Sequence, residues 1–500
     1  MAFWSNKTPF YAVLNIKNIS MNIKQQTVKG TFWSFIERFS VQSVQFIVQI
    51  IMARLLCPDD YGLIAMLAIF LAISQAFIDG GFANALVQRK DRTEKDYSSV
   101  FYFNIVTGLI LFAVFFFSSK AISAFYSMPQ LDSVIKVVSV NLVILSFQVV
   151  HKAKLTIEID FKTQAKISLI SVFISGTVGI IMAYQDFAYW AIVAQITINN
   201  FISTVLYWFM VKWKPLLVFS KQSFKILFSF GSKILMANLL QTFYLNIYTL
   251  VIGKMFSKTD VGNYSRADQF ATLPSSNITN ILQRVTYPIL SSIQDDDKML
   301  RKIFRNYMRL FAFVIFPLMT GFALVARPVV LFLIGEKWLG VVPLLEILCF
   351  SYMWYPLNAI QQNIMQVKGR SDLFFRLELV KKTIGFILIF ISIPYGMKYL
   401  CLTIVAYSLI SMVLNTWFAC RLIKFRIWTQ VKDIAKILLI TLIMAIPIWF
   451  VNKMLIINNI LLLIISLIIG VGTYVLSAKL LKYEELFQIA SLIKGFRKHK

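Results

Sequence analysis

Basic residues are distributed unevenly among the segments that separate the apolar stretches of this chain. We recognise fourteen apolar stretches. The N-terminus, every second loop and the C-terminal tail together hold 39 of the 50 Lys and Arg residues, the other loops hold 10, and Arg38 lies inside the first stretch. Segments rich in Lys and Arg stay on the cytoplasmic side of a membrane. The pattern predicts a multi-pass protein of the bacterial inner (plasma) membrane with both termini in the cytoplasm.

The composition supports this prediction and excludes other classes of protein. The chain is 58% apolar and 15% charged, against about 45–50% and about 25% in soluble domains. A spanning helix needs roughly 20 apolar residues, so fourteen helices account for most of the 500 residues. The net charge of +27 is spread over many loops. We therefore expect membrane lipids as partners and no nucleic acid.

Three short matches indicate that the chain repeats itself. The segment 32–35 resembles 227–230, 60–62 resembles 260–262, and 86–89 resembles 281–284. The nearly constant offset suggests two six-helix halves of the same orientation around a central path, an arrangement typical of transporters. We therefore predict an all-α polytopic membrane protein of about fourteen transmembrane helices. Its predicted parts are an N-terminal cytoplasmic tail (1–30), a six-helix bundle (31–210), a basic cytoplasmic connector (211–232), a second six-helix bundle (233–420), an extra helix pair (421–477) and a basic cytoplasmic tail (478–500) that lies on the membrane face.

Catalytic and metal-binding patterns are weak. The four cysteines are scattered and there are only two histidines, so we expect no metal site, no cofactor and no enzyme activity. Asp295, Asp296 and Asp297 resemble a metal-binding DxD pattern, but we interpret them as caps of the basic helix that follows.

A polar stripe runs along the first apolar stretch. Arg38, Gln42, Gln45 and Gln49 recur at helical spacing and share one face. Lipid cannot satisfy their hydrogen bonds, so they face water or another helix. We predict that they line a substrate cavity, with interhelical hydrogen bonding as the alternative. Asn238 and Gln241 would supply the same polarity in the second half.

Four further ionisable residues fall inside or near apolar stretches, where charges are usually functional or paired. Arg266 and Asp268 are candidates for the substrate cavity, since arginine binds phosphate in bidentate fashion; mutual pairing or a place at the interface is the alternative. Asp79 and Glu346 are candidates for ion coupling, and static packing is the alternative for both.

At these residues the sequence resembles a known family. The segments 33–38, 53–62, 81–91 and 260–267 are similar to Wzx-type polysaccharide flippases, in particular the branch of colanic acid and teichuronic acid exporters. The resemblance extends from about residue 21 to the end of the second predicted bundle. It implies membership of the multidrug/oligosaccharidyl-lipid/polysaccharide exporter superfamily and a MATE-like fold.

The resemblance also implies a substrate, an oligosaccharide on undecaprenyl pyrophosphate that is moved from the cytoplasmic to the periplasmic leaflet. Other polysaccharide assembly proteins would then be partners. Two alternatives stay open: an ion-coupled multidrug exporter of the same fold, and a membrane-embedded polysaccharide polymerase or ligase. The short outer loops and scarce histidines argue against the enzyme.

Overall fold

The computed structural model describes residues 40–79, 82–89, 91–455, 457–489 and 491, and their regular structure is entirely helical. Arg38 lies outside the described residues. The chain divides into two compact units, Met1–Lys254 and Met255–Lys500. The division falls near the end of a long helix, whereas the sequence analysis places its connector at 211–232. The predicted domain ranges stay a prediction.

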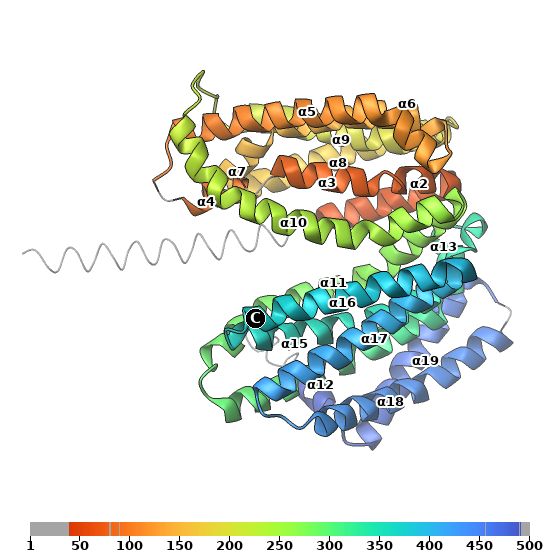
Figure 1. The fold of residues 1–500 in the computed structure, drawn as a ribbon. Helices are drawn as coiled ribbons and strands as arrows, with labels where there is room; N and C mark the ends of the chain where they lie inside the picture. Colours follow the sequence, from red (N-terminus) through yellow and green to blue (C-terminus); the bar gives the residue numbers. More distant parts are fainter. Residues whose placement is uncertain (1–39, 80–81, 90, 456, 490, 492–500) are drawn as a thin grey trace, which may run out of the picture. The chain divides into compact units, whose positions relative to one another are not determined.

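The first unit is a bundle of long helices joined by short loops (Figure 1). It begins with the apolar helix Ser40–Leu55. The helices that follow are α2 (Pro58–Ala65), α3 (Ala68–Asp79), α4 (Phe82–Gln88), α5 (Glu94–Tyr126), α6 (Gln130–Ser146), α7 (Val149–Ile157), α8 (Phe161–Tyr184), α9 (Tyr189–Met210) and α10 (Lys221–Met255). Neighbours in sequence pack together, with α5 against α6 and α8 against α9.

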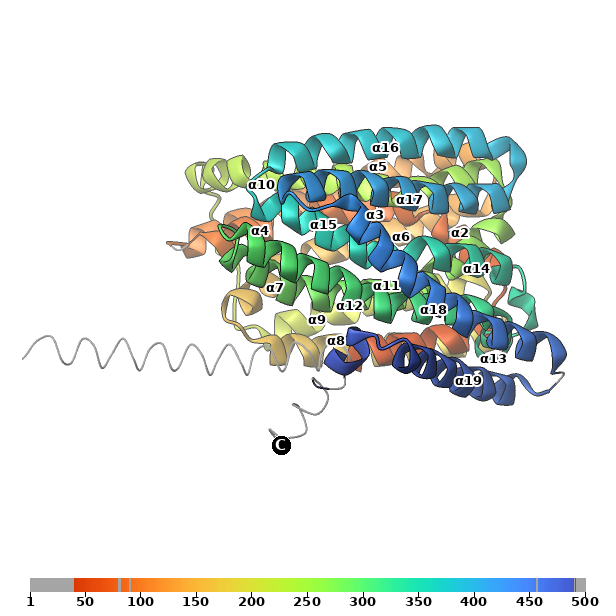
Figure 2. The ribbon, with the colours of Figure 1, turned by 90° about the horizontal axis from the view of Figure 1, so that it is seen from below.

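The second unit is also a helical bundle (Figure 2). Its elements are α11 (Lys258–Ser292), α12 (Asp297–Leu324), α13 (Ala326–Leu333), η1 (Glu336–Trp338), α14 (Val341–Tyr352), α15 (Tyr355–Val367), α16 (Ser371–Ser392), η2 (Ile393–Tyr395), α17 (Met397–Leu422), α18 (Ile427–Met454) and α19 (Asn459–Leu480). Helices α18 and α19 pack side by side, and α18 also packs against α12.

Seven helices of the described part are long and apolar enough to cross a membrane: α5, α8, α9, α12, α17, α18 and α19. The number rises to nine if each of two bent pairs, α2 with α3 and α6 with α7, is a single span. The prediction of an all-helical, multi-pass membrane protein is confirmed. The finer count of fourteen spans stays a prediction.

Breaks divide several of the apolar stretches into shorter helices. Helices α2 and α3 meet at 41°, as do α6 and α7. The stretch around 340–365 is divided into α14 and α15, and Pro356 lies in the first turn of α15. Proline fits there because the first turn of a helix has no internal partner for its N–H groups. Hydropathy averaged over a whole apolar stretch does not reveal such breaks.

Matching caps support the internal repeat. The Oδ2 atom of Asp60 accepts a hydrogen bond from the N–H of Cys57 at 3.0 Å, which closes the start of α2. In the second unit, Oδ2 of Asp260 accepts from the N–H of Ser257 at 3.2 Å and closes the start of α11. Both aspartates occupy the third position of their helix, where a carboxylate can satisfy an unpaired backbone donor. The same local rule therefore starts the equivalent helix in each unit.

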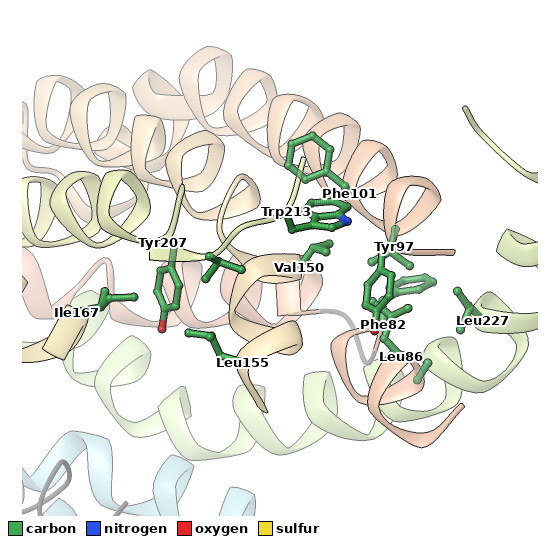
Figure 3. Packing of buried hydrophobic residues seen from close by; sticks show 13 residues of the cluster. Phe82, Leu86, Tyr97, Phe101, Val150, Leu155, Ile167, Tyr207, Trp213 and Leu227 are labelled. Carbon is green, nitrogen blue, oxygen red and sulfur yellow. The ribbon is translucent and has the colours of Figure 1, made fainter. Parts of the chain in front are cut away.

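An aromatic cluster holds together one end of the first unit (Figure 3). Phe82, Tyr97, Phe101 and Trp213 are among its buried members, and the rings of Phe101 and Trp213 lie 5.8 Å apart, edge to face. The Nε1 of Trp213 also donates to Glu94 at 2.6 Å. These contacts attach the segment after α9 to the beginning of α5.

A helix cap and an ion pair stabilise the first half of α12. Asp296 accepts hydrogen bonds from the backbone of Lys298 at 2.9 Å and of Met299 at 3.0 Å, so its interpretation as a helix cap is confirmed. Further along, Arg305 forms a bidentate pair with Asp433 of α18, at 2.6 and 2.9 Å. The basic face of α12 is thus partly neutralised within the unit.

Candidate functional site

The helix Ser40–Leu55 carries polar side chains on one face and packing residues on another. Gln45 is exposed, while Gln42 and Gln49 are half-buried. On the packing face, Val48 and Met52 are buried in a cluster with residues of α8 and α9. Helical spacing places Gln42, Gln45 and Gln49 on one face, and their lining of a substrate cavity stays a prediction.

Two exposed amides lie midway along α10. Asn238 and Gln241 are both exposed, and their spacing of three residues places them on one side of the helix. Asn238 is about 25 Å from the beginning of α10, given a rise of about 1.5 Å per residue. Amides on a helix that meets lipid need water or polar partners, because acyl chains offer no hydrogen bonds.

A third group of exposed amides lies on α11 of the second unit. Asn277, Asn280 and Gln283 are exposed and spaced three residues apart. The buried face of the same helix carries Ser275 and Thr286, which bond to neighbours in the unit. Helix α11 thus separates its polar residues into a bonded inner set and an exposed outer set.

Asp268 and Arg266, which are predicted as cavity residues, are held by separate contacts at the beginning of α11. The hydroxyl of Tyr352, on α14, donates to Oδ1 of Asp268 at 2.6 Å. Arg266 is 6% exposed, donates to the side-chain oxygen of Gln269, and lies over the ring of Trp338 at 5.8 Å. These contacts hold both side chains within the second unit, and their role in a substrate cavity stays a prediction.

The two candidates for ion coupling lie in different units. Asp79 is the last residue of α3. Glu346 is exposed on α14, whose opposite side is buried through residues such as Leu345 and Leu348. No group of three or more His, Cys, Asp or Glu residues that could hold a metal ion occurs among the described residues.

One pair of charged residues was missed by the sequence analysis. Glu378 and Lys381 form an ion pair within α16, three residues apart. The side chain of Lys381 is only 3% exposed, and that of Glu378 is 23% exposed. An acid and a base one helical turn apart beside an apolar run are a signal that sequence alone carries.

The described part defines an all-helical, multi-pass membrane protein, and comparison with known proteins identifies its family. The family model described as "Polysaccharide biosynthesis protein" matches residues 51–343. The chain belongs to this family of polysaccharide biosynthesis proteins, in agreement with the resemblance seen in its sequence.

Curated relatives point in the same direction. The chain is 27% identical over 429 residues to the teichuronic acid biosynthesis protein TuaB of Bacillus subtilis (strain 168), covering 85% of this chain and 89% of the relative. It is 24% identical to the lipopolysaccharide biosynthesis protein WzxC of Escherichia coli (strain K12), covering 72% and 74%. It is also 22% identical to the succinoglycan biosynthesis transport protein ExoT of Rhizobium meliloti (strain 1021), covering 68% and 67%.

Solved structures establish the fold. The lipid II flippase MurJ, in an inward closed conformation, matches with a TM-score of 0.73 and 17% identity, covering 90% of this chain and 98% of MurJ. An inward-facing multidrug resistance MATE family transporter matches with a TM-score of 0.60 and 13% identity, covering 78% and 99%. The fold is thus MurJ- and MATE-like. The relative ExoT is named as a transport protein, MurJ as a flippase and the MATE protein as a transporter, in agreement with the prediction that the chain is not an enzyme.

Proposed function

We propose that this protein is a flippase that moves oligosaccharide units linked to undecaprenyl pyrophosphate from the cytoplasmic to the periplasmic leaflet of the bacterial inner membrane. The glycan then enters an O-antigen, capsule or exopolysaccharide, with other assembly proteins acting before and after it. The family, the MurJ-like fold and the names of the relatives support this proposal.

The observation that carries the proposal is a set of exposed amides on three helices, Ser40–Leu55, α10 and α11. Gln45, Asn238 and Gln241 in the first unit and Asn277 and Asn280 in the second are all exposed. Sugar hydroxyls are donors and acceptors, as amides are, so these residues suit an uncharged glycan. Acyl chains would leave the same amides unsatisfied.

The remaining predicted residues receive distinct roles in this proposal. Arg38, which the sequence spacing predicts to share the polar stripe of the first apolar stretch, binds the pyrophosphate. Within the second unit, Asp268 and Arg266 are substrate-binding residues, and Tyr352 orients Asp268. The protein alternates between states open to either side, with fourteen spans and both termini in the cytoplasm.

Depletion of the protein in its host tests the proposal. Mass spectrometry of undecaprenyl-linked glycans should show complete repeat units that accumulate on the cytoplasmic side. Complete units stranded in the periplasmic leaflet, or incomplete units, would contradict flipping and indicate an enzyme. Unchanged lipid-linked glycans together with increased drug sensitivity would instead support a multidrug exporter, an alternative that the MATE-like fold keeps open.

A further inference from the structure

The segment between α9 and α10 exposes a run of four apolar residues. Leu217 is 95% exposed, more than any other large apolar side chain in the described part of the chain, and Leu216, Val218 and Phe219 are exposed as well. In Figure 1 the segment is the yellow-green loop just before α10. Consecutive apolar residues at a surface usually serve an interaction. We call residues 216–219 the apolar tip.

Hydrogen bonds to α5 hold the apolar tip at both ends. The N–H of Leu216 donates to Oγ of Ser98 at 2.9 Å, and the N–H of Ser220 donates to Oγ of Ser99 at 2.9 Å. Both serines are buried. Before the tip, the buried indole of Trp213 donates to the side chain of the first residue of α5. The tip is therefore attached to the first turns of a helix that is apolar enough to cross a membrane.

A tight turn places Leu217 at the surface. The N–H of Val218 donates to the carbonyl oxygen of Leu216 at 2.7 Å, which closes a three-residue turn with Leu217 at its centre. Pro215 precedes this turn, and its ring fixes its own φ angle. The exposure of Leu217 therefore follows from defined backbone contacts of the segment.

The apolar tip lies near one end of a second helix that can cross a membrane. Helix α9 has 22 residues, or about 33 Å along its axis, which matches a hydrocarbon core of about 30 Å. It ends at Met210, and Trp208 and Phe209 in its last turn are exposed. Tryptophan is typical of the boundary between hydrocarbon and headgroups. We therefore expect the tip, which begins at residue 216, to lie in the headgroup layer.

Positive charge surrounds the apolar tip. Four exposed lysines flank it in the sequence: Lys212, Lys214, Lys221 and Lys225. None of the four forms an ion pair with a described residue. The carboxylate of Glu94, which is bonded to Trp213, lies 3.7 Å from Lys154 instead. The flanking charges therefore complement an anionic surface outside the protein.

We propose that residues 212–225 form a binding surface for anionic phospholipids, in which the apolar tip enters the headgroup layer and the four flanking lysines bind lipid phosphates. The place of the segment at the ends of α5 and α9 favours lipid over a protein partner. The ammonium group of lysine is a point charge on a flexible stem, which suits a fluid layer of phosphates. This surface does not depend on the proposed flippase function.

Contact of the tip with lipid is measured on the purified full-length protein in nanodiscs. Cys57 is exposed and is replaced by serine, whereas the other three cysteines are buried. A fluorophore attached at Leu217→Cys then reports contact with a lipid that carries a quencher near its headgroup. Gln185→Cys is the matched control, because it is exposed in the loop at the opposite end of α9, where residues 185–188 include no lysine or arginine.

The lipid composition decides the outcome. Quenching at Leu217→Cys should rise at least about 2-fold when phosphatidylglycerol is added to phosphatidylcholine nanodiscs, because each lysine favours an anionic surface. Quenching at Gln185→Cys should be the same in both lipids. Low quenching at Leu217→Cys in both lipids would overturn the proposal and indicate a protein partner. Equally high quenching in both would overturn the role of anionic lipid.

Lysine variants test the charged part of the surface. In the Leu217→Cys background, the four flanking lysines are replaced together by glutamine, and the rise in quenching should be lost. The control replaces four exposed lysines of the second unit by glutamine and should keep the rise: Lys432, Lys436, Lys479 and Lys482. A rise that persists without the flanking lysines, or that is lost equally in the control, would overturn the assignment of this surface.

Discussion

The hydroxyl of Tyr352 donates a 2.6 Å hydrogen bond to the carboxylate of Asp268, joining α14 to α11 inside the second unit. The backbone oxygen of Tyr352 also accepts from the hydroxyl of Ser275 at 2.7 Å. Asp268 and Ser275 are seven residues apart, so they lie on one face of α11. A single residue of α14 thus fixes two turns of α11 and orients a carboxylate that the sequence analysis assigns to the substrate path.

Replacing this tyrosine should weaken the second unit. Tyr352→Phe removes the donor to Asp268, and a polar group left without its partner costs about 1–3 kcal/mol. We expect a lower midpoint of thermal unfolding in detergent. Tyr355→Phe is the control, since Tyr355 is 50% exposed and should change the midpoint little. Equal midpoints for the two variants would show that the bond to Asp268 contributes nothing to stability.

The exposed amides of α10 should matter for transport and not for folding. The double variant Asn238→Leu and Gln241→Leu removes two polar side chains that are exposed, so unfolding should change by less than about 0.5 kcal/mol. Glycan export should fall several-fold, because the sugar loses hydrogen-bond partners. Met236→Leu, at an exposed apolar position of the same helix, is the control. Normal export by the double variant would remove both amides from the proposed path.

Arg38→Ala should impair glycan export while the protein still inserts into the membrane. The sequence spacing predicts that this arginine shares the polar face of the first apolar stretch, where it would bind an anionic group. Export is measured with a complementation assay, and protein amount in the membrane is measured in parallel. Full export by a normally expressed variant would exclude Arg38 from the site.

Close packing between α8 and the first described helix gives a test of the fold. A Cβ atom added at Gly176 would lie 2.6 Å from Cγ2 of Val48, and the branched side chain of valine has little freedom to move. Gly176→Ala should therefore destabilise the protein by about 1–3 kcal/mol. Thermal unfolding in detergent measures the effect.

Two variants control this experiment. Val48→Ala should restore most of the stability of Gly176→Ala, because it removes the atoms that clash. Gly472→Ala, where the added Cβ would meet nothing within 4 Å, should leave stability unchanged. If Val48→Ala fails to rescue Gly176→Ala, the contact between these helices is not the cause of the loss.

Two adjacent acidic residues of the C-terminal segment differ in burial, so the loss of their ion pairs should affect stability differently. Arg309 contacts both Glu485, whose side chain is 1% exposed, and Glu484, which is 72% exposed. Arg309→Gln leaves the buried Glu485 carboxylate unpaired, which costs about 3–5 kcal/mol and should open the segment after α19 to protease. Glu484→Gln should change protease sensitivity little, because exposed pairs contribute about 0–1 kcal/mol. Equal cleavage of the two variants would contradict this reading of the contact.

Much of the fold follows from the sequence, because long apolar runs and charge bias act over whole helices. The caps at Asp60, Asp260 and Asp296 were also predictable, since they depend on only a few adjacent residues. The breaks between α2 and α3, between α6 and α7 and between α14 and α15 were not predictable. They depend on local backbone geometry that an average over twenty residues conceals.

The candidate site was less predictable than the fold. Periodicity identified Gln45, Asn238 and Gln241, and the structure leaves all three exposed. It could not show that Arg266 is packed against Trp338, because that contact joins residues 72 positions apart. The spacing of Glu378 and Lys381 allows an ion pair to be predicted from the sequence. The burial of Lys381 against α17 could not be predicted, because sequence periodicity does not report it.

The central claim is tested most directly by reconstituting the purified protein in liposomes with an undecaprenyl-pyrophosphate-linked oligosaccharide. A membrane-impermeant glycosidase added outside then reports how much glycan reaches the outer leaflet. The account predicts that the protected fraction of glycan disappears with the wild type and persists with the Asn238→Leu and Gln241→Leu double variant. Persistent protection with folded wild-type protein, at any imposed pH gradient, would contradict the claim that this chain flips lipid-linked glycans.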